Sequence, residues 1–440
     1  MNRIFSRSAT FIRRRAGAAL AALLGIAIFV PAAAKGGDTW PGWRGPSGLG
    51  VSDEKDLPLN WGGATNENVI WKSALPGTDS QAQEDHNQSS PIVWKDRVFV
   101  VMAYWPKGTG QAGSPEHHVA SYSAADGSLK WDVKVPPGPW LLTDLRGGYA
   151  APTPCTDGLR VYALFGSSEL VAVDFEGHLI WRKEITPFAW DVAVGTSAVL
   201  TRDALLVLAD GNKPELSRLI AFDSATGNIK WERKRPDANF DHTTPLLIDV
   251  KGRQQLLIAS SGALQGLDPM DGSEIWRASN PGDVCTPAYG GGLLYCESGR
   301  GGPGVAVDPT DNGDVTATHV RWRTSPIPEG FSSPTIVGGS IYRIHNPGIL
   351  RCLDLASGKQ IFDQRMPPGF ESAPSPIATA DGRLYFASGG VSVVLAGGPT
   401  FGPLATNDLG DGAPSSPAVA RGCLYIKGSR YLYCIGKAGG

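Results

Sequence analysis

The sequence predicts an all-β protein, an eight-bladed β-propeller whose blades are four-stranded antiparallel sheets. Two observations support this prediction. The same turn sequence recurs along the chain, and its copies are roughly forty to fifty residues apart. The 440 residues include 56 glycines and 34 prolines, as expected for many short strands joined by tight turns. Four strands in a unit of this length are typical of a propeller blade.

The repeated turn is clearest from Ala221 to Trp231. Asp223 is expected to accept hydrogen bonds from backbone N–H groups two or three residues on, and Gly227 to supply the positive φ of the turn. Ile229 and Trp231 alternate with polar residues, so we expect both on the buried face of a strand. Further copies end at Trp131, Trp181, Trp276 and Trp322, and one ends at Phe362.

Eight units begin with a Ser/Thr-Pro step or a close variant of it. They start at Ser90, Thr153, Ser197, Thr244, Thr286, Ser333, Ser375 and Ser416. The eighth unit lacks a Trp-bearing fourth strand, and we expect the isolated strand at Val69 to Trp71 to complete it. Closing the ring in this way removes exposed sheet edges. Residues 66–440 are thus predicted to form one propeller, and residues 35–65 an irregular lead-in packed on its outside.

Residues 1–34 have the pattern of a secretory signal peptide. Arg13 to Arg15 precede an apolar run, and Ala32-Ala33-Ala34 form an Ala-x-Ala cleavage pattern. The apolar run is too short to span a bilayer comfortably. We therefore expect cleavage after Ala34 and a periplasmic or secreted protein that has no transmembrane helix. The formal net charge of -2, with no basic stripe in the body of the chain, argues against a nucleic-acid partner.

Six cysteines remain in the exported chain, where disulfides are permitted. Cys423 and Cys434 would face each other if residues 427–430 form a turn. Cys285 and Cys296 would do so if Gly290-Gly291 is a two-residue turn. The alternative is that all six cysteines are small buried apolar residues.

The loops that enter the innermost strands are expected to crowd one face of the propeller around its axis. The candidate ligand-binding residues in these loops are His86, Asn87, Arg146, Tyr149, Trp190, Asp191, Asp241, His242 and Glu371. A funnel with arginine, histidine, carboxylate and aromatic side chains suits a polar ligand. Taken singly, many of these side chains could instead satisfy backbone groups of their own loops.

Two other kinds of site have weaker support in the sequence. A zinc site would draw on His86, His117, His118 and His242, but the neighbours His117 and His118 would point apart on a strand. A hydrolase would need two carboxylates at a fixed separation, and nothing in the sequence fixes the spacing of Asp241 and Glu371.

The Ala/Val-x-Asp-x-x-x-Gly-x-x-x-Trp repeat, seen at Ala221 to Trp231, resembles the pyrroloquinoline quinone (PQQ) propeller repeat. This resemblance covers about residues 66–436, and the lead-in Trp40-Pro-Gly-Trp-Arg-Gly-Pro is similar to that of exported BamB-like PQQ-repeat proteins. The resemblance implies that one tryptophan of each unit docks between neighbouring blades. The matching residues are Trp71, Trp131, Trp181, Trp231, Trp276 and Trp322.

Two classes of function follow from the resemblance. We expect a monomeric, non-catalytic binding or scaffold module of the cell envelope, with no metal or cofactor and with an envelope protein or a glycan as its partner. The alternative is a PQQ-dependent alcohol or sugar dehydrogenase, with PQQ and Ca²⁺ held among Arg146, Asn87, Asp191, Asp241 and Glu371. The family's dehydrogenases often carry two adjacent cysteines beside the quinone, and no two of the six cysteines in this chain are adjacent.

Overall fold

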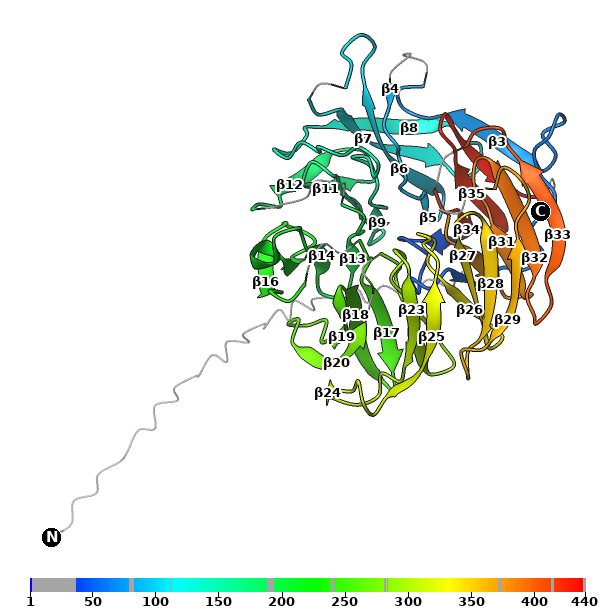
Figure 1. Ribbon diagram of the computed structural model, residues 1–440. Coiled ribbons are helices and arrows are strands. Elements are labelled where there is room, and N and C mark those ends of the chain that lie inside the picture. The colour runs from blue at the N-terminus through cyan, green and yellow to red at the C-terminus, as the bar shows by residue number, and fades with distance from the viewer. Residues whose placement is uncertain are drawn as a thin grey trace. The chain divides into compact units, whose positions relative to one another are not determined.

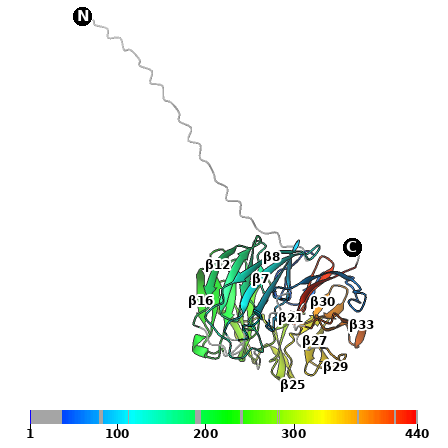
Figure 2. The same cartoon turned by 90° about the horizontal axis from the view of Figure 1, so that it is seen from above.

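Eight four-stranded antiparallel sheets stand around a common axis in the computed structural model, as predicted (Figure 1). They belong to one compact unit, Lys35–Gly440. Figure 2, turned by 90°, shows the sheets side by side. The structure describes Met1 and residues 37–78, 83–111, 113–187, 194–238, 242–280, 282, 284–370, 374–412 and 415–437.

The blades are numbered 1 to 8 in chain order, and the strands of each blade run from the innermost to the outermost. Blades 1 and 2 are β5 (Ile92–Trp94), β6 (Arg97–Trp105), β7 (Glu116–Ser123) and β8 (Leu129–Val135), then β9 (Cys155–Thr156), β10 (Arg160–Leu164), β11 (Glu169–Asp174) and β12 (Leu179–Glu184). Blades 3 and 4 are β13 (Val199–Leu200), β14 (Leu205–Ala209), β15 (Arg218–Phe222) and β16 (Ile229–Lys234), then β17 (Leu246–Val250), β18 (Arg253–Ser260), β19 (Gly262–Leu267) and β20 (Glu274–Asn280).

Blades 5 to 8 repeat the same order. Blades 5 and 6 are β21 (Ala288–Gly290), β22 (Leu293–Cys296), β23 (Gly302–Val307) and β25 (Val320–Ile327), then β26 (Thr335–Val337), β27 (Ser340–His345), β28 (Ile349–Asp354) and β29 (Gln360–Arg365). Blades 7 and 8 are β30 (Ile377–Thr379), β31 (Arg383–Phe386), β32 (Val391–Ala396) and β33 (Gly402–Asp408), then β34 (Ala418–Ala420), β35 (Cys423–Lys427), β36 (Tyr431–Ile435) and β3 (Val69–Ala74).

Four short strands lie outside this scheme: β1 (Thr39–Trp40), β2 (Val51–Ser52), β4 (Gln83–Glu84) and β24 (Gly313–Asp314). A single 3₁₀ turn, η1 (Pro214–Leu216), is the helical element of the described chain. None of the helices among the described residues has the length and apolar character needed to cross a membrane.

An early strand closes the ring, as predicted. β3 pairs antiparallel with β36, from Val69 opposite Ile435 to Ala74 opposite Tyr431. In Figure 1 the blue β3 therefore lies in the same blade as the red strands at the other end of the chain. The indole of Trp71 then donates a hydrogen bond of 3.0 Å to the carbonyl of Ala124, which ties blade 8 to blade 1.

The same contact between blades recurs around the ring. The indole N–H groups of Trp131, Trp181 and Trp322 donate to the carbonyls of Phe175, Ser224 and Leu355, at 2.8, 3.0 and 3.0 Å. Each accepting carbonyl belongs to the Asp/Gly turn of the next blade. In the turn after β15, Asp223 Oδ1 accepts the N–H groups of Ala225 and Thr226 at 3.1 and 2.9 Å, which is the turn chemistry that the sequence predicts.

Blade 4 makes this contact through an intermediary side chain. Trp276 is fully buried, and its indole donates to Gln255 Oε1 at 2.7 Å. Gln255 Nε2 in turn donates to the carbonyl of Pro309 at 3.1 Å. Pro309 follows Asp308 in the turn of blade 5, just as Ser224 follows Asp223 in the turn of blade 3. Gln255 therefore bridges the indole of Trp276 to the turn of the next blade.

The turn glycine beneath each indole offers a test of this docking. Gly227 has φ +68, and a Cβ on it would lie 2.8 Å from the ring of Trp181. Gly252 has φ +85 but has no neighbour within 4 Å. We expect Gly252→Ala to cost only the backbone strain of a left-handed residue, and Gly227→Ala to cost about 1–3 kcal/mol more because it also overpacks the indole. Urea unfolding of the two variants checks this, and equal losses would contradict the docking role of the turn.

The expected burial of Ile229 is wrong. Ile229 is 57 % exposed, although alternation placed it with Trp231 on the buried face. The reason is a bulge: Ala221 pairs with Trp231 and Phe222 with Ile229, so Lys230 is an extra residue in the outer strand. A bulge shifts the alternation by one residue, and it turns Ile229 to the outside.

The lead-in was expected to pack on the outside of the propeller. Instead, it runs across the innermost strands. β1 pairs with β5 of blade 1. The N–H of Thr156 in blade 2 donates to the carbonyl of Pro41 at 2.9 Å, and the N–H of Ala378 in blade 7 to that of Gly50 at 2.8 Å. Trp40 is buried. The physical reason is that the aromatic and apolar side chains of this segment are removed from water only against the blade cores.

The six cysteines are buried free thiols. Lys427 pairs with Leu432 rather than with Arg430, so the register is shifted by two residues and Cys434 lies opposite Tyr425 rather than Cys423. Cys423 and Cys434 therefore lie diagonally across the two strands rather than directly opposite each other. Their disulfide therefore stays a prediction.

The second proposed cysteine pair is not brought together. Gly290 pairs with Leu293, which makes Gly291-Gly292 the turn and shifts the register by two residues. The thiol of Cys285 instead points toward blade 6, where it donates to the carbonyls of Gly330 and Ser332 at 3.4 and 3.5 Å.

Candidate functional site

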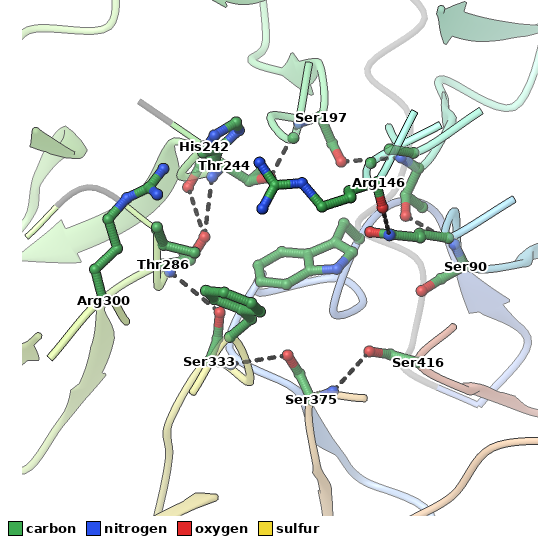
Figure 3. Close-up of a pocket in the computed structure, with 18 residues that line it drawn as sticks. Ser90, Arg146, Ser197, His242, Thr244, Thr286, Arg300, Ser333, Ser375 and Ser416 are labelled. Carbon is green, nitrogen blue, oxygen red and sulfur yellow. Dashed lines mark hydrogen bonds between the residues drawn. The ribbon is translucent and has the colours of Figure 1, made fainter. Parts of the chain in front are cut away.

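Eight hydroxyl side chains, one from the start of each innermost strand, surround the axis. This hydroxyl ring consists of Ser90, Thr153, Ser197, Thr244, Thr286, Ser333, Ser375 and Ser416. From Ser90 to Ser375, the backbone N–H of each member donates to the hydroxyl of the next, at 2.9 to 3.1 Å (Figure 3). Proline follows most of these residues because the first position of an edge strand needs no N–H donor. These hydrogen bonds therefore tie each blade to the next, from blade 1 to blade 8.

A buried ammonium group joins blade 8 to blade 1. Lys427 is fully buried, and its Nζ donates to Ser89 Oγ at 2.7 Å and to the carbonyl of Val101 at 3.4 Å. A buried cation requires such partners because it has lost its water. The junction where the two ends of the chain meet is therefore held at the axis as well as by the outer strand β3.

The hydroxyl ring surrounds a pocket of about 330 Å³. Trp43 of the lead-in is one of its lining residues, and with Thr244 and Thr286 it also lines a second cavity of about 170 Å³. The remaining lining residues are Gln88, Arg146, Gly147, Ala151, Gly195, His242, Val284, Arg300 and Phe331.

Two arginines stand on opposite sides of the hydroxyl ring (Figure 3). The side chain of Arg146 is 83 % exposed, and its guanidinium binds Asp144 with a closest contact of 2.5 Å. This hydrogen bond lowers the pKa of Asp144, as an adjacent cation does for a carboxylate. Arg300 follows Ser298, whose hydroxyl accepts the backbone N–H of Arg300 at 3.0 Å.

A buried carboxylate holds the loop that carries Arg146. Asp85 Oδ2 accepts the backbone N–H groups of Tyr149 and Ala150, at 2.5 and 3.2 Å. Gly148 has φ +76, and a Cβ there would lie 2.5 Å from Asp85 Oδ2, so only glycine fits. Burial raises the pKa of Asp85 although these N–H groups favour its charged form.

The structure divides the sequence-predicted residues into two groups. Arg146 and His242 line the pocket, whereas His86 is exposed and not among the lining residues. Asn87 is buried, where its Oδ1 accepts from the N–H of Ala103 at 2.8 Å and its Nδ2 donates to the carbonyl of Ala103 at 3.0 Å. Tyr149 is buried, and its hydroxyl accepts from the N–H of Leu142 at 3.0 Å. Asn87 and Tyr149 thus shape the loops instead of facing a ligand, because each satisfies a backbone group.

Four of the predicted residues, Trp190, Asp191, Asp241 and Glu371, lie outside the described residues. Sequence reasoning missed Trp43, Arg300 and the role of the hydroxyl ring. A serine or threonine was visible in the sequence at the start of all eight units, and this recurrence could have indicated that the hydroxyl groups share a role. Trp43 and Arg300 carried no comparable signal.

Of the five residues that the sequence offers for PQQ and Ca²⁺, the structure describes Asn87 and Arg146. The oxygen ligands that Ca²⁺ prefers are already engaged near the pocket: the amide of Asn87 with Ala103, Asp85 with two backbone N–H groups and Asp144 with Arg146. None of the described residues that line the pocket is Asp or Glu. The three other carboxylates that the sequence offered for this site lie outside the described part of the chain.

A zinc site is likewise not formed by the described residues, among which no group of three His, Cys, Asp or Glu side chains can hold a metal ion. His117 and His118 point apart, as expected for neighbours on a strand. His117 Nε2 contacts Ser167 Oγ at 2.8 Å, whereas His118 Nδ1 contacts Asp132 Oδ1 at 2.8 Å.

Comparison with known proteins identifies the repeat. The family model described as outer membrane protein assembly factor BamB matches residues 59–189 and 115–364. No curated protein matches the chain.

Three similar solved structures differ widely in what they are. BamB from Moraxella catarrhalis has a TM-score of 0.57 at 14% identity and covers 84% of this chain and 98% of its own. Quinohemoprotein alcohol dehydrogenase ADHIIG from Pseudomonas putida HK5 has a TM-score of 0.60 at 11% identity, over 92% and 77%. The computationally designed Ika8 protein has a TM-score of 0.55 at 11% identity, over 83% and 99%. At these identities the likeness shows the fold alone.

Proposed function

This chain belongs to the PQQ-like repeat propeller family described as outer membrane protein assembly factor BamB, and from that membership we propose that it is an exported, non-catalytic binding or scaffold module of the cell envelope. Its ligand or partner is held in the axial pocket. The observation that carries the proposal is the hydroxyl ring, to which every blade contributes one side chain around a single pocket.

The construction of the pocket supports binding more than chemistry. The members of the hydroxyl ring are joined by hydrogen bonds from blade to blade, so the pocket is organised before a ligand arrives, and a preorganised site spends less free energy on ordering. At its rim, the side chains of Phe331 and Arg300 are exposed. The described lining residues include no carboxylate that could act as a general base.

Site-specific crosslinking tests this proposal. A photo-reactive amino acid at Phe331, which is 49 % exposed at the pocket, is expected to form crosslinks in cells that make the protein. The matched control is the same substitution at Leu159, which is 68 % exposed and does not line the pocket. Crosslinks from Leu159 but not from Phe331, or from neither position, would overturn the assignment of the axial pocket.

The alternative function, a PQQ-dependent dehydrogenase, is tested directly by reconstitution. Purified protein is mixed with PQQ and Ca²⁺ and dialysed, and dye reduction is then followed with alcohols and sugars. We expect no turnover, because the described residues supply no Ca²⁺ site and no base. Retention of the quinone together with turnover would replace the binding function by the catalytic one.

A further inference from the structure

We infer that the axial pocket recognises a saccharide ring of an envelope glycan, stacked on Trp43. The inference rests on the proposed binding function and adds the chemical class of the ligand. Its basis is that one indole, that of Trp43, lines the same pocket as the eight hydroxyl groups of the ring. A pyranose has the matching character, with C–H groups on its faces and hydroxyl groups around its edge.

Trp43 is held in place by the lead-in. The neighbouring Arg44 is buried, and its guanidinium carbon lies 5.5 Å from the centroid of the Trp43 ring, within the range of a cation–π contact. Arg44 Nη2 donates to Thr335 Oγ1 of blade 6. Gly50 has φ +69 and packs against the Arg44 side chain. Trp43 is therefore a preorganised platform, and a flat apolar face can stack on it without first ordering the indole.

The hydroxyl ring supplies donors and acceptors around this platform. A serine or threonine hydroxyl has one hydrogen to donate and two lone pairs. Each hydroxyl from Thr153 to Ser416 uses one lone pair to accept an N–H of the preceding blade. Within the described chain, the hydroxyl of Thr286 also donates, to the carbonyl of Thr244 at 3.2 Å. A sugar hydroxyl, which is itself both donor and acceptor, can pair with such groups in either sense.

The size of the pocket suits a saccharide of one or two units. Its volume of about 330 Å³ is at the lower end of ligand pockets, which span about 300–1,000 Å³. One or two sugar units can enter such a pocket, with the rest of the glycan leaving past Arg146 and Arg300 at the rim.

Saturation-transfer NMR tests the inference with three defined probes: a trimer of N-acetylglucosamine, an α-linked glucose trimer and a galacturonic acid trimer. We expect at least one trimer to show transfer to its ring C–H protons. Trp43→Ala should weaken its binding at least tenfold, because the stacking surface is lost. The matched control is Trp94→Ala, since Trp94 is also half-buried but packs on Gly158 outside the pocket. Circular dichroism establishes that each variant is folded.

A second pair of variants covers the case in which Trp43→Ala does not fold. Ser375→Ala removes one hydroxyl of the ring, whereas Ser375→Thr keeps it, so weaker binding by the first but not by the second is expected. Binding that is unchanged in both Trp43→Ala and Ser375→Ala would overturn the inference. So would a folded wild type that binds none of the three probes.

The crosslinking experiment separates this failure from failure of the proposed function. Crosslinks from Phe331 to a protein, without binding of any trimer, would leave the binding function in place and replace the glycan by a polypeptide partner. If neither crosslinks nor saccharide binding is observed, both assignments fall.

Discussion

Replacing Arg343 by methionine is expected to lower the free energy of unfolding by about 3–5 kcal/mol, because it leaves a buried carboxylate without its partner. Arg343 and Glu297 are each only 1 % exposed, and Arg343 Nε contacts Glu297 Oε1 directly. Tyr295 adds a hydrogen bond of 3.2 Å to the other oxygen of Glu297. The pair joins blade 5 to blade 6, so its loss affects the packing between two sheets.

Arg343 also contacts the loop that forms part of the rim of the pocket. Arg343 Nη2 donates to the carbonyl of Gly330 at 3.2 Å, and Gly330 precedes the rim residue Phe331. Urea unfolding followed by circular dichroism measures the loss of stability. The control is Arg277→Met, whose partner Glu274 lies at 2.8 Å but whose side chain is 41 % exposed, so we expect a change within about 1 kcal/mol. Similar losses in the two variants would show that the buried pair has no special role.

Acid is expected to destabilise the protein through His117 by about 1.4 kcal/mol for each pH unit between pH 6.5 and pH 3. The side chain is fully buried, and burial lowers its pKa to about 3. In the unfolded chain the pKa returns to about 6.5. The unfolded state therefore binds more protons in this range, and stability falls as the pH falls. The contribution is complete above pH 6.5 and fully lost below about pH 3.

Unfolding at two pH values isolates this contribution. Between pH 6.5 and pH 4.5 the wild type should lose about 2.3 kcal/mol of stability through His117. His117→Gln, which does not titrate, should show a correspondingly smaller loss over the same interval. His178→Gln is the control, because that histidine side chain is 75 % exposed. If wild type and His117→Gln lose the same stability on acidification, His117 does not carry the effect.

Most of the architecture could be predicted because its signals are local. The turn at Asp223 and Gly227 depends on hydrogen bonds and a φ angle within a few residues, and such a turn can be recognised from its own sequence. Repetition then gave the number of blades, and the missing strand of the eighth unit gave the closure at Val69–Ala74. The wrong details, the exposure of Ile229 and the partner of Cys285, both follow from register shifts of one or two residues. The alternation of apolar and polar residues within one strand cannot reveal such a shift, because the register depends on how two strands pair.

The site could be predicted only in part. Loop position selected Arg146 and His242, which line the pocket, but also Asn87 and Tyr149, whose side chains bond backbone groups instead. Whether a loop side chain faces the axis or a backbone N–H depends on the neighbouring blade. For Tyr149 that neighbour includes Asp85, which precedes it by more than sixty residues. No local pattern contains this information.

The sequence by itself determined the repeating unit, the number of blades and the way in which the ring closes, because turns and strand alternation are set by residues that are near one another in the chain. The tertiary structure alone decided that Trp43, Arg146 and Arg300 line one pocket within a ring of hydroxyls. These residues are far apart in the sequence, and they meet because each blade must bury its faces against the next and satisfy its N–H groups at the axis.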